Sequence, residues 1–98
     1  MHPPFFLRPA RKPLEIMDLT TLRYFVEIAR EQSFTAAAER LFVTQPTLSR
    51  QIADLEEELG QKLFNRTTRS LELTEKGHFL FRRAQDILAL VDRTKLET

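Results

Sequence analysis

Residues 33–60, SFTAAAERLFVTQPTLSRQIADLEEELG, carry two successive apolar stripes with the spacing of α-helices. The first stripe consists of Phe34, Ala37, Ala38 and Leu41. The second stripe consists of Leu48, Ile52, Leu55 and Leu59. Apolar residues that recur every three or four positions share one face of a helix, and that face is normally buried in a core. The stretch therefore predicts two amphipathic helices that contribute to one core.

Residues that commonly cap the start or the end of a helix mark the limits of both predicted helices. Ser33 or Thr35 is suited to cap the first helix, and Thr44 is suited to cap the second. Gly60 provides a stop for the second helix, because glycine readily adopts the left-handed conformation that ends many helices. Residues 42–44 then form the turn between them. A short helix, a tight turn and a longer capped helix predict a helix-turn-helix, whose second helix lies in the major groove of DNA.

The face of the second helix that points away from its apolar stripe favours a role in DNA binding. At about 100° per residue, this face carries Pro46, Ser49, Arg50 and Ala53. Small or hydrogen-bonding side chains allow a helix to approach base edges, and Gln45 at the N-terminal end is suited to pair with adenine or to contact a phosphate. The alternative interpretation is an ordinary solvent-exposed face of a small helical domain.

The distribution of charge adds an orientation. The second half of this helix carries four acidic residues, which we interpret as a solvent-exposed face: Asp54, Glu56, Glu57 and Glu58. Phosphates repel carboxylates, so the helix is expected to enter the groove with its N-terminus first. Residues 40–53 and 59–71 contain no acidic residue and are candidate DNA-facing segments. The net charge of +1 divides into +2 for residues 1–16 and −1 for the rest, so bulk positive charge is not the basis of this prediction.

The residues before these two helices fall into two parts, an N-terminal extension and a further helix, with the boundary at residue 17. Residues 1–16 contain four prolines and no apolar period, which predicts a disordered extension; a basic arm that touches DNA is the alternative. A further helix is predicted after Asp18, which is suited to cap it. Its apolar stripe consists of Leu22, Phe25, Val26 and Ala29.

A short β-hairpin is predicted after the second helix of the helix-turn-helix. Leu63 and Phe64 on one side and Leu71 and Leu73 on the other flank a polar loop, residues 65–70. Two arginines lie in this loop, which we expect to form the tip: Arg66 and Arg69. A basic loop in this position is typical of a wing that reaches a phosphate or the minor groove. A surface loop without a role in DNA binding is the alternative.

A fourth helix is predicted to begin at Thr74 and Glu75 and to run toward the C-terminus. Its broad apolar stripe consists of Leu80, Phe81, Ala84, Ile87, Leu88 and Val91. Phe79 and Leu90 lie nearly opposite this stripe. One small domain cannot easily cover both faces, so we expect two copies to pair through Phe79, Leu80, Ile87, Leu90 and Val91. The alternative is a helix that only closes the core of its own chain.

The composition argues against other functional classes. The chain has no cysteine and two histidines, which argues against disulfides, a metal site and a cofactor. It also lacks a glycine-rich phosphate loop, and His78 is expected to be a surface or packing residue, so we do not expect an enzyme. No apolar run approaches the roughly 20 residues that span a bilayer, which predicts a soluble protein. The absence of cysteine fits a cytoplasmic location.

The run LRYFVEIAREQSFTAAAERLFVTQPTLSRQIADLEEELGQKLFNRTTRSLELTEKG, residues 22–77, resembles the N-terminal domain of LysR-type transcriptional regulators. The resemblance extends from Met17 to about Val91. It implies a mainly α fold, a winged helix-turn-helix with a small two-stranded β wing and a long C-terminal linker or dimerisation helix. It also places at the DNA interface Gln45, Pro46, Thr47, Ser49 and Arg50, with Arg69 on the wing.

The same resemblance implies the partners and the division of the chain. We expect a bacterial regulator that binds double-stranded DNA at interrupted inverted repeats as a dimer or tetramer. The expected parts are an extension at 1–16, the winged helix-turn-helix at 17–74 and the linker helix at 75–98. Family members usually continue into an effector-binding domain, so we expect this chain to be part of a longer protein whose missing domain takes a small-molecule co-inducer. A helical module that binds another protein through its fourth helix is the rival function.

Overall fold

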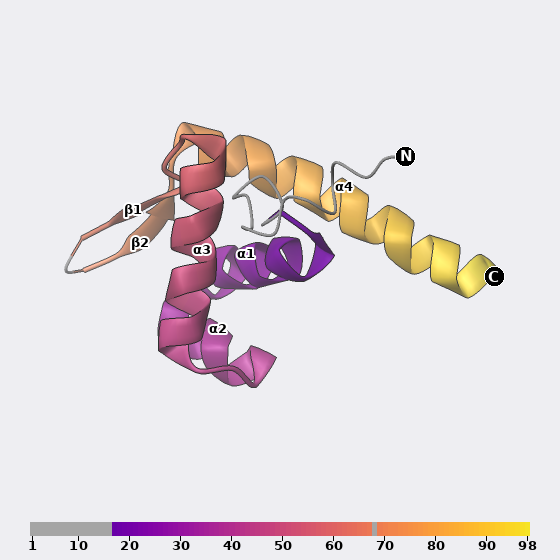
Figure 1. The fold of residues 1–98 in the computed structure, drawn as a ribbon, viewed down its shortest axis with the longest axis horizontal. Helices are drawn as coiled ribbons and strands as arrows, with labels where there is room; N and C mark the ends of the chain where they lie inside the picture. Colours follow the sequence, from indigo (N-terminus) through magenta and orange to yellow (C-terminus); the bar gives the residue numbers. More distant parts are fainter. Residues whose placement is uncertain (1–16, 68) are drawn as a thin grey trace, which may run out of the picture.

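The computed structural model describes residues 17–67 and 69–98. Within them the chain forms a mainly helical domain with one antiparallel hairpin (Figure 1). The elements are α1 (Leu19–Glu31), α2 (Phe34–Leu41), α3 (Gln45–Leu59), β1 (Phe64–Arg66), β2 (Leu71–Leu73) and α4 (Glu75–Glu97). This order confirms the predicted helix-turn-helix, wing and long last helix. The extension predicted for residues 1–16 lies outside the described residues.

The helices begin where the sequence predicts. A side-chain oxygen accepts a hydrogen bond from a backbone N–H of the first turn at the start of α1, α2, α3 and α4, and the four capping residues are Asp18, Ser33, Thr44 and Thr74. These bonds satisfy donors that have no partner within the helix. Ser33, not Thr35, is therefore the cap of α2.

Three helices end in the left-handed conformation. Gly60 ends α3 with φ 66°, as predicted, whereas Gln32 ends α1 with φ 54° and Phe42 ends α2 with φ 60°. This conformation suits glycine and is unfavourable for a bulky side chain. The Phe42 ring gains no compensating burial, because the residue is 93% exposed.

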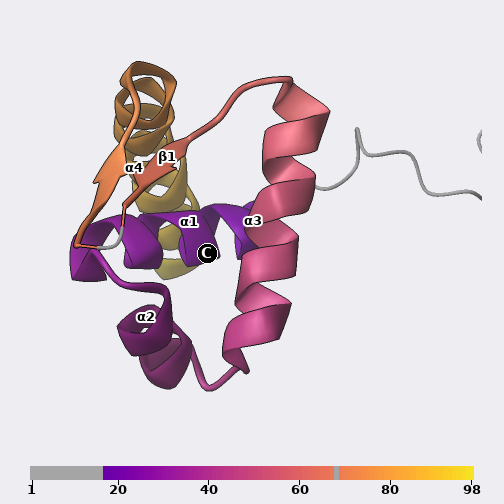
Figure 2. The ribbon, with the colours of Figure 1, turned by 90° about the vertical axis from the view of Figure 1, so that its left-hand side faces the viewer.

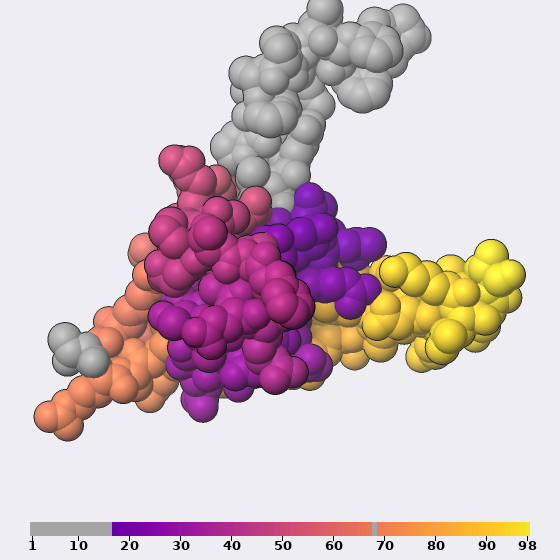
Figure 3. Space-filling model, turned by 90° about the horizontal axis from the view of Figure 1, so that it is seen from below, coloured from indigo at the N-terminus to yellow at the C-terminus, as the bar shows by residue number. Residues whose placement is uncertain are grey.

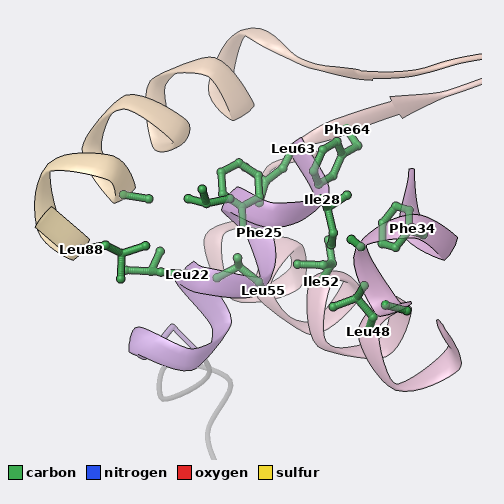
Figure 4. Close-up of a cluster of buried hydrophobic side chains, with 14 residues drawn as sticks. Leu22, Phe25, Ile28, Phe34, Leu48, Ile52, Leu55, Leu63, Phe64 and Leu88 are labelled. Atoms are coloured by element: carbon green, nitrogen blue, oxygen red, sulfur yellow. The ribbon is translucent and has the colours of Figure 1, made fainter. Parts of the chain in front are cut away.

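The core lies where α1, α2 and α3 meet, and α4 and the base of the hairpin close it (Figure 2; side chains in Figure 4). Three phenylalanines connect these parts: the Phe64 ring lies 5.4 Å from the ring of Phe25 and 5.8 Å from the ring of Phe34, measured between centroids. Ile28, fully buried, belongs to the core although it was not in the predicted stripe of α1. The stripes predicted for α1, α2 and α3 otherwise face this core.

The fourth helix is fixed at its N-terminal end and in its middle. Ala84 and Leu88 are buried, and α4 packs along α1. Gly77 lies so close to the preceding loop that a Cβ there would approach the carbonyl oxygen of Leu63 to 2.1 Å. Beyond these contacts α4 extends away from the body on the side opposite the wing (Figures 1 and 3).

None of the described residues belongs to a helix that is both long and apolar enough to cross a membrane. Over the same part of the chain, His, Asp and Glu side chains do not gather in groups of three or more that could hold a metal ion.

Candidate nucleic-acid interface

The third helix separates a buried face from a solvent-exposed face, as its sequence predicts. Leu48, Ile52 and Leu55 are completely buried in the core. The residues predicted to face DNA lie on the other side or at the N-terminal end: Gln45, Pro46, Thr47, Arg50 and Ala53 are exposed and Ser49 is half-buried. The structure therefore brings the predicted reading residues together on one accessible surface, which we call the reading face.

Hydrogen bonds organise the polar side chains at the start of α3. The Gln45 amide nitrogen donates to the Ser49 hydroxyl at 2.7 Å, one helical turn later. The hydroxyl oxygens of Thr44 and Thr47 lie 2.8 Å apart, and the Thr44 hydroxyl also caps the helix. The amide oxygen of Gln45 and its second N–H remain available for a ligand. A carboxamide held in this way presents a donor and an acceptor side by side, which matches the major-groove edge of adenine.

The acidic half of α3 is not uniformly solvent-exposed, so that interpretation is wrong for Glu56. Glu57 is exposed, but Glu56 is only 9% exposed. Its Oε2 accepts hydrogen bonds from the backbone N–H groups of Leu63 at 2.7 Å and Phe64 at 3.3 Å. Glu56 therefore joins the end of α3 to the base of the wing. Helical periodicity places Glu56 one turn after Ile52, about 40° from it at the edge of the buried face, but only the tertiary fold supplies its partners.

The wing places one of its two arginines differently from the prediction. β1 pairs with β2 through Phe64–Leu73, Asn65–Glu72 and Arg66–Leu71, so Arg66 belongs to the strand and not to the tip. Its guanidinium lies 4.2 Å from the centre of the Phe34 ring, at the start of α2. Arg69 lies in the loop and is exposed, as predicted. The pairing reaches further toward the tip than predicted, and Arg66 has a stacking partner on α2 that the sequence does not reveal.

Thr67 shapes the loop, although the sequence analysis did not single it out. Its hydroxyl accepts hydrogen bonds from the backbone N–H groups of Arg69 at 3.2 Å and Ser70 at 3.0 Å. Its own N–H donates to the Ser70 carbonyl at 2.9 Å. Threonine side chains often close turns in this way. These bonds fix the backbone from which the Arg69 side chain extends.

A groove of about 460 Å³ lies between α3 and β1. Its lining residues are Ala53, Glu56, Lys62, Phe64, Asn65 and Arg66. Lys62, whose side chain is 81% exposed, and Arg66 place two cations at this groove, with Glu56 on its inner side. The reading face and the wing are thus separated by a groove with a basic rim. Lys62 and Asn65 were not predicted as site residues, and the acid-free segment 59–71 was the available signal for them.

Arg40, in the other acid-free segment, is not a free cation. Its Nε lies 3.0 Å from a carboxylate oxygen of Glu27 and 3.3 Å from one of Glu31, both on α1. The segment 40–53 has no acidic residue in sequence, but the fold supplies two from another helix. Arg50 is therefore the arginine of this segment that remains on the reading face.

The predicted pairing residues of α4 form a partly exposed surface. Phe79 is 47% exposed, Ile87 41% and Leu90 57%, and Leu80 and Val91 are half-buried beside them. Ile87 belongs with Phe79 and Leu90, not with buried Ala84 and Leu88 as the predicted stripe had it. At 100° per residue these three side chains fall within about 80° of the helix circumference. We call the surface made by Phe79, Leu80, Ile87, Leu90 and Val91 the α4 apolar face.

Comparison with known proteins identifies relatives of this arrangement. The family model described as "Bacterial regulatory helix-turn-helix protein, lysR family" matches residues 19–78. The HTH-type transcriptional regulator BenM of Acinetobacter baylyi is 51% identical over 77 residues, which are 79% of this chain and 25% of BenM. The HTH-type transcriptional regulator BudR of Klebsiella aerogenes is 55% identical over 76 residues, 78% of this chain and 53% of BudR. The chain thus spans between a quarter and about half of the length of these relatives.

Solved structures are similar over the same region. The BenM DBD–catB site 1 DNA complex superposes with a TM-score of 0.80 at 48% identity, covering 83% of this chain and 90% of the BenM chain. The CbnR DBD–DNA complex superposes with a TM-score of 0.78 at 40% identity, covering 83% and 93%. Both of these neighbours are protein–DNA complexes of DNA-binding domains.

Proposed function

Because this chain belongs to the lysR family of bacterial regulatory helix-turn-helix proteins, we propose that it is the sequence-specific DNA-binding domain of a transcriptional regulator. It binds double-stranded DNA at an interrupted inverted repeat, as a dimer or tetramer. The similar BenM and CbnR domains were solved as DNA complexes, which supports this proposal.

The observation that carries the proposal is the reading face of α3. Its N-terminal half exposes small and hydrogen-bonding side chains, while the opposite side is completely buried. The helix can therefore enter a major groove without exposing core residues. The N-terminus of α3 also points the positive end of the helix dipole outward, which favours nearby phosphates.

Each residue of this face has a proposed role. Gln45, held by Ser49, reads a base edge, and Arg50 contacts a base or a phosphate in the major groove. Pro46 and Thr47 lie at the end of the helix that enters first, where small or short side chains allow close approach. The exposed Glu57 is repelled by phosphates and keeps the other end of the helix away from the DNA.

The wing contributes a second contact. Arg69, at the exposed loop, enters or lines the minor groove beside the same half-site, where a narrow groove attracts arginine. Arg66 is proposed to contribute charge from the strand, because its guanidinium stacks on Phe34 and cannot reach as far as the tip residue. An arginine that senses groove width predicts a preference for A·T-rich flanks.

Pairing of two copies is proposed to occur through the α4 apolar face. Exposed apolar side chains on one helix face favour association, and a two-fold pair suits an inverted repeat. In this proposal residues 17–74 are the DNA-binding unit and residues 75–98 the linker and dimerisation helix. The regulator works in the cytoplasm, has no enzymatic activity, and takes its small-molecule co-inducer in a domain beyond this chain.

Selection from a pool of randomised duplexes tests the proposal. We expect the 98-residue chain to enrich one sequence with two related half-sites in opposite orientation. The enriched duplex should bind at least about a thousandfold more tightly than unrelated DNA at physiological salt. Enrichment of no common sequence, with equal binding to all duplexes, would exclude sequence-specific recognition.

A further inference from the structure

A buried carboxylate links the recognition helix to the wing. Glu56 lies in the last turns of α3, and its Oε2 accepts hydrogen bonds from the N–H groups of Leu63 and Phe64, where β1 begins. Its other oxygen, Oε1, lies 3.8 Å from the Lys62 ammonium group. A buried carboxylate is stable only when its oxygens have such partners. The carboxylate and the base of the wing therefore depend on each other.

The same segment is held from its other side by α4. The Thr74 hydroxyl donates to the Lys62 carbonyl at 2.6 Å, and the Thr74 N–H donates to the Leu63 carbonyl at 2.9 Å. The N–H groups of Leu63 and Phe64 are thus bonded to α3, and the carbonyl groups of Lys62 and Leu63 are bonded to Thr74 at the start of α4. Removing the Glu56 carboxylate would leave the N–H groups of Leu63 and Phe64 without their bonds to α3, although both side chains would still pack in the core.

Small movements at this base become large at the tip. Three positions lead from Phe64 to Thr67, where the loop begins, and a strand rises about 3.3 Å per residue, so the tip lies on the order of 10 Å from the base. A tilt of about 10° there would displace the tip by about 2 Å, whereas hydrogen-bond distances tolerate only about 0.5 Å. The stacking of Arg66 on Phe34 also braces the wing, but Arg66 is exposed to water, which weakens that contact.

We infer that Glu56 is a positioning residue that sets the register between the reading face of α3 and the minor-groove contact of Arg69. This inference rests on the proposed function, because it assigns a role within the same DNA-binding surface. Glu56 itself touches no DNA. It decides whether major-groove and minor-groove contacts are made together on one half-site.

The test compares four single variants on two duplexes that share the selected half-sites and differ only in A·T-rich or G·C-rich flanks. Glu56→Ala should abolish the preference between flanks and lower the slope of log affinity against log salt by about 1, as expected for one lost contact. Base preference within the half-sites should not change. Arg69→Ala should give the same result as Glu56→Ala, and in the double variant the two effects should not add.

Two further variants separate positioning from charge. Glu56→Gln keeps an oxygen that accepts both N–H bonds, so it should retain the flank preference. Glu57→Ala removes the same charge from an exposed neighbouring position. It should retain the flank preference and bind all duplexes slightly more tightly, because one repulsive carboxylate is lost.

The inference fails if Glu56→Ala retains the flank preference, or if it weakens half-site and flank recognition alike, because either result shows a role in folding only. Circular dichroism and thermal unfolding establish that each variant is folded. If Glu56→Ala does not fold, Glu56→Asp decides the question, because its side chain is one methylene too short to reach the N–H groups of Leu63 and Phe64. Loss of the flank preference in this variant would support the inference, and retention of the preference would overturn it. A wild-type chain that selects no site would instead refute the proposed function.

Discussion

Replacing Gly77 by alanine is expected to destabilise the domain, although alanine is the better helix former. Gly77 is buried in the first turn of α4. A Cβ at this position would lie 2.1 Å from the Leu63 carbonyl oxygen and 2.9 Å from Cδ2 of Leu73. The Leu73 side chain can rotate away, but the Leu63 carbonyl is backbone and is already bonded to the Thr74 N–H at 2.9 Å. Relief of the clash therefore requires α4 and the wing base to separate by about 1 Å.

The size of the effect follows from two opposing contributions. Overpacking of this kind costs about 1–3 kcal/mol, and a rigid backbone neighbour places Gly77→Ala at the upper end. Alanine returns about 1 kcal/mol through its higher helix propensity. The free energy of unfolding should therefore fall by about 2 kcal/mol. For a domain of this size that corresponds to a decrease in Tm of about 8–16 °C.

Thermal unfolding followed by circular dichroism measures this change, with all proteins at one concentration because pairing of copies would make Tm depend on concentration. Gly60→Ala is the matched control: no atom lies within 4 Å of its added Cβ, but its φ of 66° strains alanine. That strain should cost about 1 kcal/mol. A Gly77→Ala protein that melts at or above the wild-type temperature, or no lower than Gly60→Ala, would show that α4 does not depend on this close approach.

Three further expectations concern the reading face, the α4 apolar face and the turn of the helix-turn-helix. Arg50→Ala should weaken binding to the selected duplex by about 1–3 kcal/mol if Arg50 contacts a base, whereas Arg93→Ala near the end of α4 should have little effect; equal affinities would refute the Arg50 assignment. Leu90→Glu should shift the chain toward monomer in sedimentation and reduce its affinity for the duplex with two half-sites. The control Leu96→Glu, at a residue that is 86% exposed, should do neither. A wild-type chain that is monomeric at concentrations where it binds tightly would contradict this expectation. Phe42→Asn should raise the free energy of unfolding by about 1 kcal/mol, because asparagine tolerates the left-handed conformation better; a lower Tm would show that the exposed ring contributes to stability.

The sequence predicts the elements of this fold well because their signals are local. Capping residues, a helix-ending glycine and apolar stripes act within a few positions, so Thr44, Gly60 and the Leu48 stripe specify α3 without reference to the rest of the chain. The same holds for the exposed side of α3, since helical periodicity alone places Arg50 away from the core. Ile28 was not predicted to be buried because the core surrounds more of α1 than a single stripe.

The sequence predicts less where a residue depends on distant partners. Glu56 resembles its acidic neighbours in sequence, and its burial follows only from N–H groups that the next loop brings to it. Arg66 was expected at the tip because a polar loop at residues 65–70 does not show where strand pairing stops, and its stacking partner Phe34 comes from α2. Arg40 lies in a segment without acidic residues, but its partners, Glu27 and Glu31, lie on α1. In each case the missing information was tertiary.

Long-range contacts also join the parts of the chain that are proposed to read one half-site. The ion pair between Arg23 and Asp92 joins α1 to α4 at 2.9 Å, but the two side chains are 41% and 56% exposed. An exposed pair of this kind contributes little, about 0–1 kcal/mol. The direction of α4 must therefore be set by its buried contacts, Ala84 and Leu88 in the middle and Gly77 at the start. Gly77 packs on the wing base that Glu56 also holds, so one segment joins the recognition helix, the wing and the start of α4. If α4 pairs two copies, the separation of their reading faces is then fixed by packing and not by surface charge, and it should change little with salt.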